Sequence, residues 1–491
     1  MFIPLGCNWD MAESLKEKTA KGLFWGGVSN GVQQVLNLAF GIFLARMLSQ
    51  SDYGMVGMLA IFTLIAIALQ EGGFISALNR KKDVTHKDYN AVFWFNVFVG
   101  LLLYVILFLC APLISRFYGV PELTPLARFV FLGIPIVSLG VSPGAYLFRN
   151  MMVRQSAIIT FTCNFVSGVV ALCLAANGFA YWGIAVQSVV FVSIVTGLRF
   201  CFSKWHPTLS FDFSPLKEMF GFSSKLIITN VFNIVNGNVF SVILGRLYTP
   251  RDVGNYTQAN KWNNMGSSLI TGMLGSIAQP VFAKTEDNTE RQKRIFRKLL
   301  RFTAFISFPA MFGLALVAKE FIVILLTEKW LESARMMQML CIAGAFVPIS
   351  TLFSNLIITR GRSTTYMWCT ISLCLAQLMA VCLSVSYGID VMIMVYVVIS
   401  ICWLFVWYHY AHKEIEISLS EVIRDIFPYF FLSALFSVVA YLSTANIGNY
   451  YLCFILKVLI VALPYCICLW LFGSAIFKEI IVFLTKRELS S

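Results

Sequence analysis

Long apolar stretches alternate with short polar segments along the whole chain. Fourteen of these stretches approach the length of about 20 residues that an α-helix needs to cross a membrane. Strands of a membrane barrel are shorter and alternate apolar with polar positions, which these stretches do not. The pattern therefore predicts an all-α integral membrane protein. The predicted spans are 22–46, 53–78, 90–112, 123–146, 157–176, 181–202, 220–247, 254–282, 300–318, 336–359, 365–386, 390–411, 426–445 and 450–472.

One short sequence occurs twice at corresponding places in this pattern. Residues 44–54 read LARMLSQSDYG and residues 244–254 read LGRLYTPRDVG, so an arginine, an aspartate and a glycine recur at an offset of 200. Each copy ends one predicted span and begins the next, and we expect its aspartate to cap the second helix and its glycine to allow close packing. The copies lie on spans 1 and 7, an even separation that predicts two six-helix lobes in parallel orientation.

The duplication divides the chain into predicted parts. The last two spans have no counterpart in either lobe. The polar segment 284–301 carries charges of both signs at helical spacing, and we expect a helix along the membrane surface there. The predicted parts are a lead at 1–21, a first lobe at 22–202, a linker at 203–219, a second lobe at 220–411, and the two extra spans with a tail at 412–491.

Composition and charge support a membrane protein and orient it. Hydrophobic residues make up 58% of the chain and charged residues 12%, against about 25% charged in a soluble domain. One set of alternate loops, together with the termini, carries 26 Lys and Arg, and the other set carries eight. Because basic loops stay in the cytoplasm, both termini are predicted to be cytoplasmic. The net charge of +13 is spread over these loops, so we expect no nucleic-acid partner.

Polar residues form stripes inside the leading span of each predicted lobe. In span 1 they occur at positions i, i+3, i+4 and i+7 of a helix, and span 7 carries a matching set. Hydrogen bonds between packed helices and the walls of a hydrated cavity both account for such stripes. Their symmetric placement favours the cavity and a polar cargo. The residues are Asn30, Gln33, Gln34 and Asn37 in span 1, and Thr229, Asn230, Asn233 and Asn236 in span 7.

Span 8 begins with NYTQANKWNNMGSS, which is too polar to face lipid. Lys261 lies about seven residues inside it, roughly 10 Å along a helix. With Gln258 and Asn264 beside it, we interpret Lys261 as a cation in the cavity; a side chain that reaches the outer face is the alternative. Lys225, a few residues inside span 7, is a second candidate.

Three further charged residues are candidates for function. Arg46 and Arg246 end spans 1 and 7, where they anchor the helices at the interface or attract an anionic group. Glu71, towards the end of span 2, is a candidate site for a coupling ion, Na⁺ or H⁺, and burial at a helix interface accounts for it equally well.

The sequence contains no catalytic constellation. The four histidines lie in or beside predicted cytoplasmic loops, and the thirteen cysteines are scattered through apolar stretches without a repeated CxxC pair. No Walker sequence is present. We therefore expect no metal site, no cofactor and no ATP hydrolysis.

The beginning of the chain carries a family resemblance. Residues 18–62, KTAKGLFWGGVSNGVQQVLNLAFGIFLARMLSQSDYGMVGMLAIF, combine a basic lead, a glycine-aromatic start, an arginine near the end of span 1 and a D-Y-G turn into span 2. This resembles bacterial polysaccharide transporters, the Wzx-type flippases and colanic-acid-type exporters of the MOP superfamily. The similarity extends over essentially the whole chain.

The resemblance implies a cargo and a mechanism. The cargo would be an oligosaccharide on a polyprenyl diphosphate, a repeat unit of O-antigen, capsule or exopolysaccharide, carried across the bacterial inner membrane by alternating access. The polar stripes would solvate the sugars, the internal lysines would meet the diphosphate, and spans 13 and 14 would guide the lipid tail. Membrane lipids and the polysaccharide polymerase machinery are the implied partners.

Three other functions fit the sequence less well. Related lipid II flippases have several arginines near the start of span 1, whereas span 1 here is uncharged before Arg46, which argues against a peptidoglycan precursor. A cation-coupled multidrug exporter of the same superfamily would typically carry acidic residues in its first spans, and span 1 has none. A membrane enzyme of glycan assembly would have a large outer loop, but the longest outer segment, 319–335, is short.

Overall fold

The computed structural model describes residues 15–71, 78, 81, 83–212, 214–285 and 287–471. Within these ranges, the side chains of residues 15–30, 71, 215 and 217–226 are outside the description. The side chains of Asn30, Glu71 and Lys225, which the sequence marks as candidates, therefore lie outside the described part.

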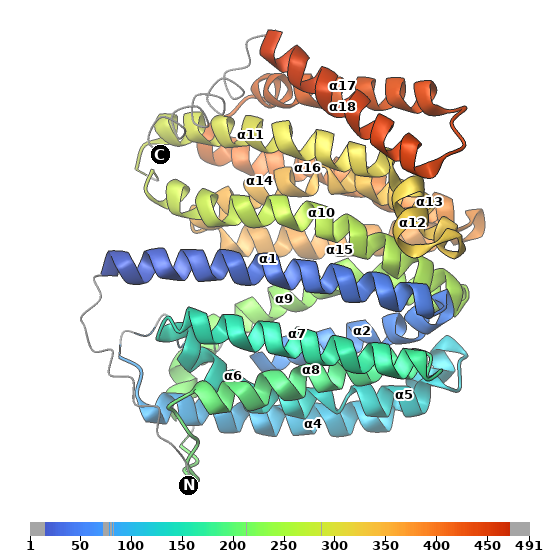
Figure 1. The fold of residues 1–491 in the computed structure, drawn as a ribbon. Coiled ribbons are helices and arrows are strands. Elements are labelled where there is room, and N and C mark those ends of the chain that lie inside the picture. The colour runs from blue at the N-terminus through green and yellow to red at the C-terminus, as the bar shows by residue number, and fades with distance from the viewer. Residues whose placement is uncertain are drawn as a thin grey trace. The chain divides into compact units, whose positions relative to one another are not determined.

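The described chain is built of helices (Figure 1). The first repeat contains α1 (Leu15–Met47), α2 (Gln50–Glu71), α4 (His86–Tyr118), α5 (Leu123–Val130), α6 (Gly133–Arg149), α7 (Val153–Ala176) and α8 (Tyr181–Phe202). The second contains α9 (Ser214–Leu247), α10 (Pro250–Ala283), α11 (Thr289–Leu316), α12 (Ala318–Leu326), η1 (Glu328–Trp330), α13 (Leu331–Gly344), α14 (Val347–Thr359), α15 (Ser363–Ser384), η2 (Val385–Tyr387) and α16 (Ile389–Ile415). The chain continues with α17 (Leu419–Thr444) and α18 (Tyr450–Leu471).

The predicted all-α membrane fold is confirmed. Among the described residues, 12 segments are long and apolar enough to cross a membrane. Helices α1 and α10 lie at the positions of predicted spans 1 and 8 and have 33 and 34 residues. Together these helices give about fourteen spans in the predicted order.

The fourth span of each repeat is broken in the middle. Helix α5 gives way to α6 at residues 131–132, and α13 gives way to α14 at residues 345–346. A proline follows each break, Pro135 in α6 and Pro348 in α14. Because proline has no N–H, the carbonyl four residues before it loses its helical partner. The two repeats therefore share this break together with a short common sequence, PIVSL at 135–139 and PISTL at 348–352.

The chain forms two compact units. Among the described residues, one unit holds those up to Met47 with those of Ala66–Arg116 and Val120–Ile227, and the other holds Leu48–Ile65, Phe117–Gly119 and those from Ile228. The first turns of α2 thus pack with the second repeat. The five parts drawn from the sequence follow the duplication and stay a prediction.

The predicted surface helix at 284–301 is not a separate element. Helix α11 begins at Thr289, where Asn288 Oδ1 accepts a hydrogen bond from Arg291 N, and runs unbroken to Leu316. Residues 289–301 are helical as predicted, but they continue into the span and form no surface helix of their own, because no helix-breaking residue precedes Pro309. Arg297 on this first part donates hydrogen bonds to Asp425 and Glu421 of α17, which tie the extra spans to the second repeat.

The segment after α8 packs on α4. Asn90 donates a hydrogen bond to Ser210 O and accepts one from Thr208 N, at 2.6 and 2.9 Å. Further along, Asp212 Oδ1 accepts hydrogen bonds from the hydroxyl and the backbone nitrogen of Ser214 at the start of α9. These bonds hold the pKa of Asp212 below its usual value, so its carboxylate stays charged at this helix start.

Candidate functional site

The duplicated sequence forms the same turn in both repeats. Asp52 accepts hydrogen bonds from the backbone nitrogen and hydroxyl of Ser49, and Ser49 Oγ accepts one from Asp52 N. Asp252 and Thr249 make the equivalent set before α10. Both are capping boxes with aspartate at the third helical position, which satisfies free N–H groups at the helix start. The expected capping role of the aspartates is confirmed.

The two turns also contact each other. A Cβ on Gly54 would lie 1.7 Å from Pro250 O, and a Cβ on Gly254 would lie 1.8 Å from Gln50 O. The first turns of α2 and α10 therefore cross at a distance that only glycine permits at both positions. The expected close packing at these glycines is confirmed.

A short segment of the second repeat reinforces this crossing. Lys329 Nζ donates a 2.7 Å hydrogen bond to Leu48 O, and Gln50 Nε2 donates to Lys329 O. The ring of Trp330 packs edge-on against Tyr53, with 5.5 Å between centroids. The turn of the first repeat is thus held by η1. The sequence pattern treats 319–335 as an outer loop, whereas most of it is the helical α12 and η1.

The two arginines of the duplicated sequence are both exposed. The guanidinium of Arg246 lies over the ring of Phe117 at 5.5 Å. This contact leaves much of the charged group accessible, so anchoring and the attraction of an anion both stay predictions.

The polar stripes keep their helical spacing in α1 and in the part of α9 from Ile228, which belong to different units. On α1, Gln33 and Gln34 are half-buried and Asn37 is exposed. On α9, Asn230 and Asn233 are exposed, and Asn233 Nδ2 donates to the hydroxyl of Tyr366 at 3.4 Å. Part of each stripe therefore faces away from the packed interior of its own unit.

The polar start of α10 divides into two faces. Gln258 is fully buried, and neither of its side-chain polar atoms has a hydrogen-bond partner within the described part of the chain. Asn255 is also buried and donates a 2.6 Å hydrogen bond to Glu332. On the other face, Lys261 is half-buried and Asn264 is exposed. The buried polar residues thus belong partly to helix packing, and only the second face is open.

A polar cavity lies within the second repeat. Its volume is about 280 Å³, and α9, α14, α15 and α16 line it. Asn233 and Asn236 of the α9 stripe are among its walls, whereas Asn230, Gln258, Lys261 and Asn264 are not. The structure therefore brings part of the predicted α9 stripe together with polar and aromatic side chains from three other helices.

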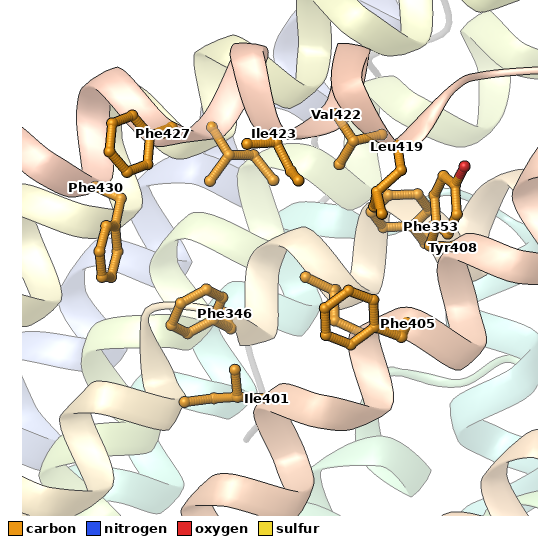
Figure 2. Close-up of a pocket in the computed structure, with 12 residues that line it drawn as sticks. Phe346, Phe353, Ile401, Phe405, Tyr408, Leu419, Val422, Ile423, Phe427 and Phe430 are labelled. Atoms are coloured by element: carbon orange, nitrogen blue, oxygen red, sulfur yellow. The ribbon is translucent and has the colours of Figure 1, made fainter.

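An apolar cavity of about 250 Å³ lies beside it (Figure 2). Phe427 and Phe430 of α17 line it from one side, and Ile401 and Phe405 of α16 from another. Phe346, at the break between α13 and α14, borders both this cavity and the polar one. The ring of Phe308 packs against the ring of Phe346, with 5.2 Å between the two centroids. A polar and an apolar cavity therefore share a wall at the broken helix.

A third cavity, of about 300 Å³, lies between α11, α12 and α18. Lys457 of α18 borders it and makes a 2.7 Å ion pair with Glu320 of α12. Both residues are buried, at 6% and 4% exposed. This pair is a fixed charge contact between the last span and the second repeat.

Repeated sets of helices, a broken helix in each repeat and two cavities beside the break between α13 and α14 define a transporter-type membrane protein. Residues 43–335, more than half of the chain, match the model of the polysaccharide biosynthesis protein family. The chain belongs to this family. Two relatives are the lipopolysaccharide biosynthesis protein WzxC of Escherichia coli, 24% identical with 71% of each chain covered, and the teichuronic acid biosynthesis protein TuaB of Bacillus subtilis, 23% identical with 87% of this chain and 89% of TuaB covered.

Solved structures show the same fold. The lipid II flippase MurJ in its inward closed conformation superimposes with a TM-score of 0.73 at 16% identity, over 93% of this chain and 99% of that one. An inward-facing multidrug resistance MATE transporter of the MOP superfamily gives 0.63 at 16% identity, over 78% of this chain and 94% of that one. The expected MOP-type fold is confirmed.

The polar cavity contains residues that sequence reasoning missed. On α16, Tyr396, Ser400, Trp403 and Trp407 follow one another at helical spacings of four, three and four. This stripe could have been found by the periodicity that revealed the α9 stripe. Aromatic residues are common in apolar spans, however, so the spacing alone does not indicate a site. A site is indicated only by the structure, which places Gln377 of α15 against these residues.

Proposed function

We propose that this protein carries polyprenyl-diphosphate-linked oligosaccharide from the cytoplasmic to the outer leaflet of a bacterial inner membrane. One observation carries the proposal: a polar cavity and an apolar cavity share Phe346 as a wall. A cargo with a hydrophilic head and a hydrocarbon tail matches such a pair of environments. Membership of a polysaccharide biosynthesis family and a fold like that of a lipid II flippase support this cargo class.

The proposed mechanism is alternating access of the two repeats around the cargo. In it, the stripe residues Asn30, Gln33, Gln34, Asn37 and Asn230 solvate the sugars together with Gln258 and Asn264. Lys225 and Lys261 meet the diphosphate, and Arg46 and Arg246 attract it or anchor their helices. The apolar cavity against α17 guides the lipid tail. We further propose that a Na⁺ or H⁺ gradient drives the cycle, with Glu71 as the candidate coupling site.

We further propose a topology for the chain and a function without enzymatic activity. Both termini lie in the cytoplasm, as the excess of basic residues in one set of loops indicates. The protein acts as a transporter and not as an enzyme, and it hands its cargo to polysaccharide polymerase machinery at the outer face.

The direct test is deletion of the gene, followed by analysis of surface polysaccharide and of lipid-linked oligosaccharide in the inner membrane. We expect loss of the polymer, with lipid-linked units trapped on the cytoplasmic leaflet, and restoration by the wild-type protein. Unchanged glycans with increased drug sensitivity would identify a multidrug exporter instead, the alternative that the MATE-like fold keeps open.

The charge contribution can be tested in the restored strain. Lys261→Ala should reduce transport at an unchanged level of membrane protein, because it removes a cation from the open face of α10. Lys319→Ala is the matched control, since Lys319 lies at the start of α12 with its Nζ 5.7 Å from the centre of the Tyr450 ring. Equal activity of the two variants would contradict a role of Lys261 in binding the cargo.

A further inference from the structure

The polar cavity of the second repeat is bordered by groups that lack partners. Asn236 Oδ1, Gln377 Oε1 and Trp403 Nε1 are buried atoms with no hydrogen-bond partner within the described part of the chain, and all three residues line the cavity. Gln377 is only 1% exposed. Burying a polar atom unpaired costs free energy, so native proteins rarely leave such atoms without a partner. Two acceptors and one donor at one cavity indicate a ligand that carries both donors and acceptors.

The other polar side chains of the cavity are held in place. Gln377 Nε2 donates to Ser400 Oγ at 2.9 Å, and Ser400 Oγ donates to Tyr396 O at 2.8 Å. These bonds fix the amide of Gln377 so that its oxygen is the atom left over. A site whose polar atoms are positioned in advance binds with a smaller loss of conformational entropy.

Aromatic rings form another wall of the same cavity. The rings of Tyr366 and Trp407 lie 5.8 Å apart at an interplanar angle of 30°, and Trp403 lies one helical turn before Trp407. The rings offer flat apolar surfaces, and the tyrosine and tryptophan edges add hydrogen-bonding groups. A pyranose ring has the matching chemistry, because its C–H faces are apolar and its hydroxyl rim both donates and accepts hydrogen bonds.

The broken helix opens the backbone beside this cavity. Phe346 borders it, and the carbonyl of Ala345 accepts a 2.7 Å hydrogen bond from Ser307 Oγ. Irregular backbone inside a membrane protein is tolerated where it is buried in protein or lines a cavity. The break therefore belongs to the architecture of this site.

The charge of the lining restricts the ligand. Among the described residues that line the cavity there is no Lys, Arg, Asp or Glu. A diphosphate or an anionic sugar would find no counter-charge there, and burying an unpaired charge is costly. A small cation would find no carboxylate and would leave most of the 280 Å³ empty. The volume is close to the lower end of about 300 Å³ for small-molecule pockets, which suits a sugar ring.

We infer that this cavity is a subsite for one uncharged glycosyl unit of the cargo. The inference rests on the proposed function and adds to it a position in the second repeat and a class of sugar. The glycosyl ring stacks on the indole of Trp403 or Trp407, and its hydroxyls pair with Asn236 and Gln377. The charged part of the cargo lies elsewhere.

The inference can be tested by saturation-transfer NMR on the purified full-length protein in lipid nanodiscs. The probe is the free oligosaccharide released by mild acid from the lipid-linked units that accumulate in the deletion strain. We expect saturation to reach the C–H protons of an uncharged sugar residue of the probe. Trp403→Leu and Gln377→Leu should each weaken binding about tenfold. Saturation that is centred on an anionic residue, or that is unchanged in both variants, would overturn the inference.

A matched control separates the subsite from general damage to the fold. Trp368→Leu changes the same type of residue on α15, but Trp368 is 59% exposed and does not line the cavity, so its binding should equal that of the wild type. Trp403→Phe provides a milder second variant if Trp403→Leu does not fold. In the deletion strain, failure of the wild-type protein to restore polymer would remove the proposed function. Restoration by the wild type and equally by Trp403→Phe and Gln377→Leu would remove only the subsite.

Discussion

Gly54 and Gly254 occupy equivalent positions in the two repeats, and each lies against the first turn of the helix that carries the other. A Cβ at either position would come within 1.8 Å of a carbonyl oxygen across the crossing. The two copies of the duplicated sequence therefore contact each other through equivalent glycines, and the contact is symmetric.

Replacing either glycine should disrupt this crossing. Gly254→Ala places a Cβ against backbone atoms that cannot rotate away, so the helices must separate, at a cost of about 1–3 kcal/mol or more. Thermal unfolding of the purified protein measures the loss. Gly272→Ala on the same helix is the control, because a Cβ added there would have no atom within 4 Å and alanine favours a helix over glycine by about 1 kcal/mol. Equal melting temperatures of both variants would show that the crossing does not stabilise the fold.

The contact of η1 with the turn of the first repeat should depend on Lys329. Lys329→Met removes the donor to Leu48 O but keeps the length of the side chain. We expect faster hydrogen exchange of residues 48–54, since the turn loses one of the groups that hold it. Lys319→Met at the start of α12 should leave the exchange of this turn at the wild-type rate. If both variants exchange alike, the hydrogen bond of Lys329 does not secure the turn.

Phe346 should keep the polar and the apolar cavity apart. Phe346→Ala would join the two spaces and let hydrocarbon enter the polar one, so transport in the restored strain should fall severalfold while the protein still reaches the membrane. Phe405→Ala removes the same ring from the apolar cavity alone, where the residue is 61% exposed. We expect the second variant to keep most of its activity. Similar losses in both would mean that the separation at Phe346 has no special importance for transport.

Much of the fold could be predicted from the sequence because the membrane imposes strong rules. A span must be helical and about 20 residues long, so the apolar stretches give the order of the helices directly. The duplicated turn could also be predicted, since its aspartates and glycines have specific roles in capping and close packing. The continuity of α11 could not be predicted, because charged residues at helical spacing occur both on a surface helix and on the extension of a span.

Only part of the candidate site could be predicted from the sequence. Asn233 was found from the polar stripe of span 7, but its partners come from α15 and α16, more than 130 residues further along the chain. Polar residues in a span can bond to another helix or face a cavity, and the sequence of one span does not decide between them. Asn255 and Gln258 of α10 illustrate this: both are buried, but Asn255 donates a hydrogen bond to Glu332, whereas neither polar side-chain atom of Gln258 has a partner within the described residues.

The ion pair between Glu320 and Lys457 should stabilise the attachment of the last span. Lys457 also donates to Leu316 O at 3.2 Å, so the ammonium group is bound by two acceptors of the second repeat. Glu320→Ala would leave a buried ammonium without its counter-charge, at a cost of about 3–5 kcal/mol. The expected result is a clear drop in melting temperature in detergent.

A second variant and a control distinguish a lost ion pair from a lost side chain. Glu320→Leu combined with Lys457→Met removes both charges and replaces them with apolar groups of similar size, which should restore most of the stability. Asp390→Asn breaks the pair between Arg335 and Asp390, whose side chains are 71% and 44% exposed, and should cost no more than about 1 kcal/mol because water screens both charges. If the double variant has the same low melting temperature as Glu320→Ala, the side chains stabilise the contact through their shape and not through their charges.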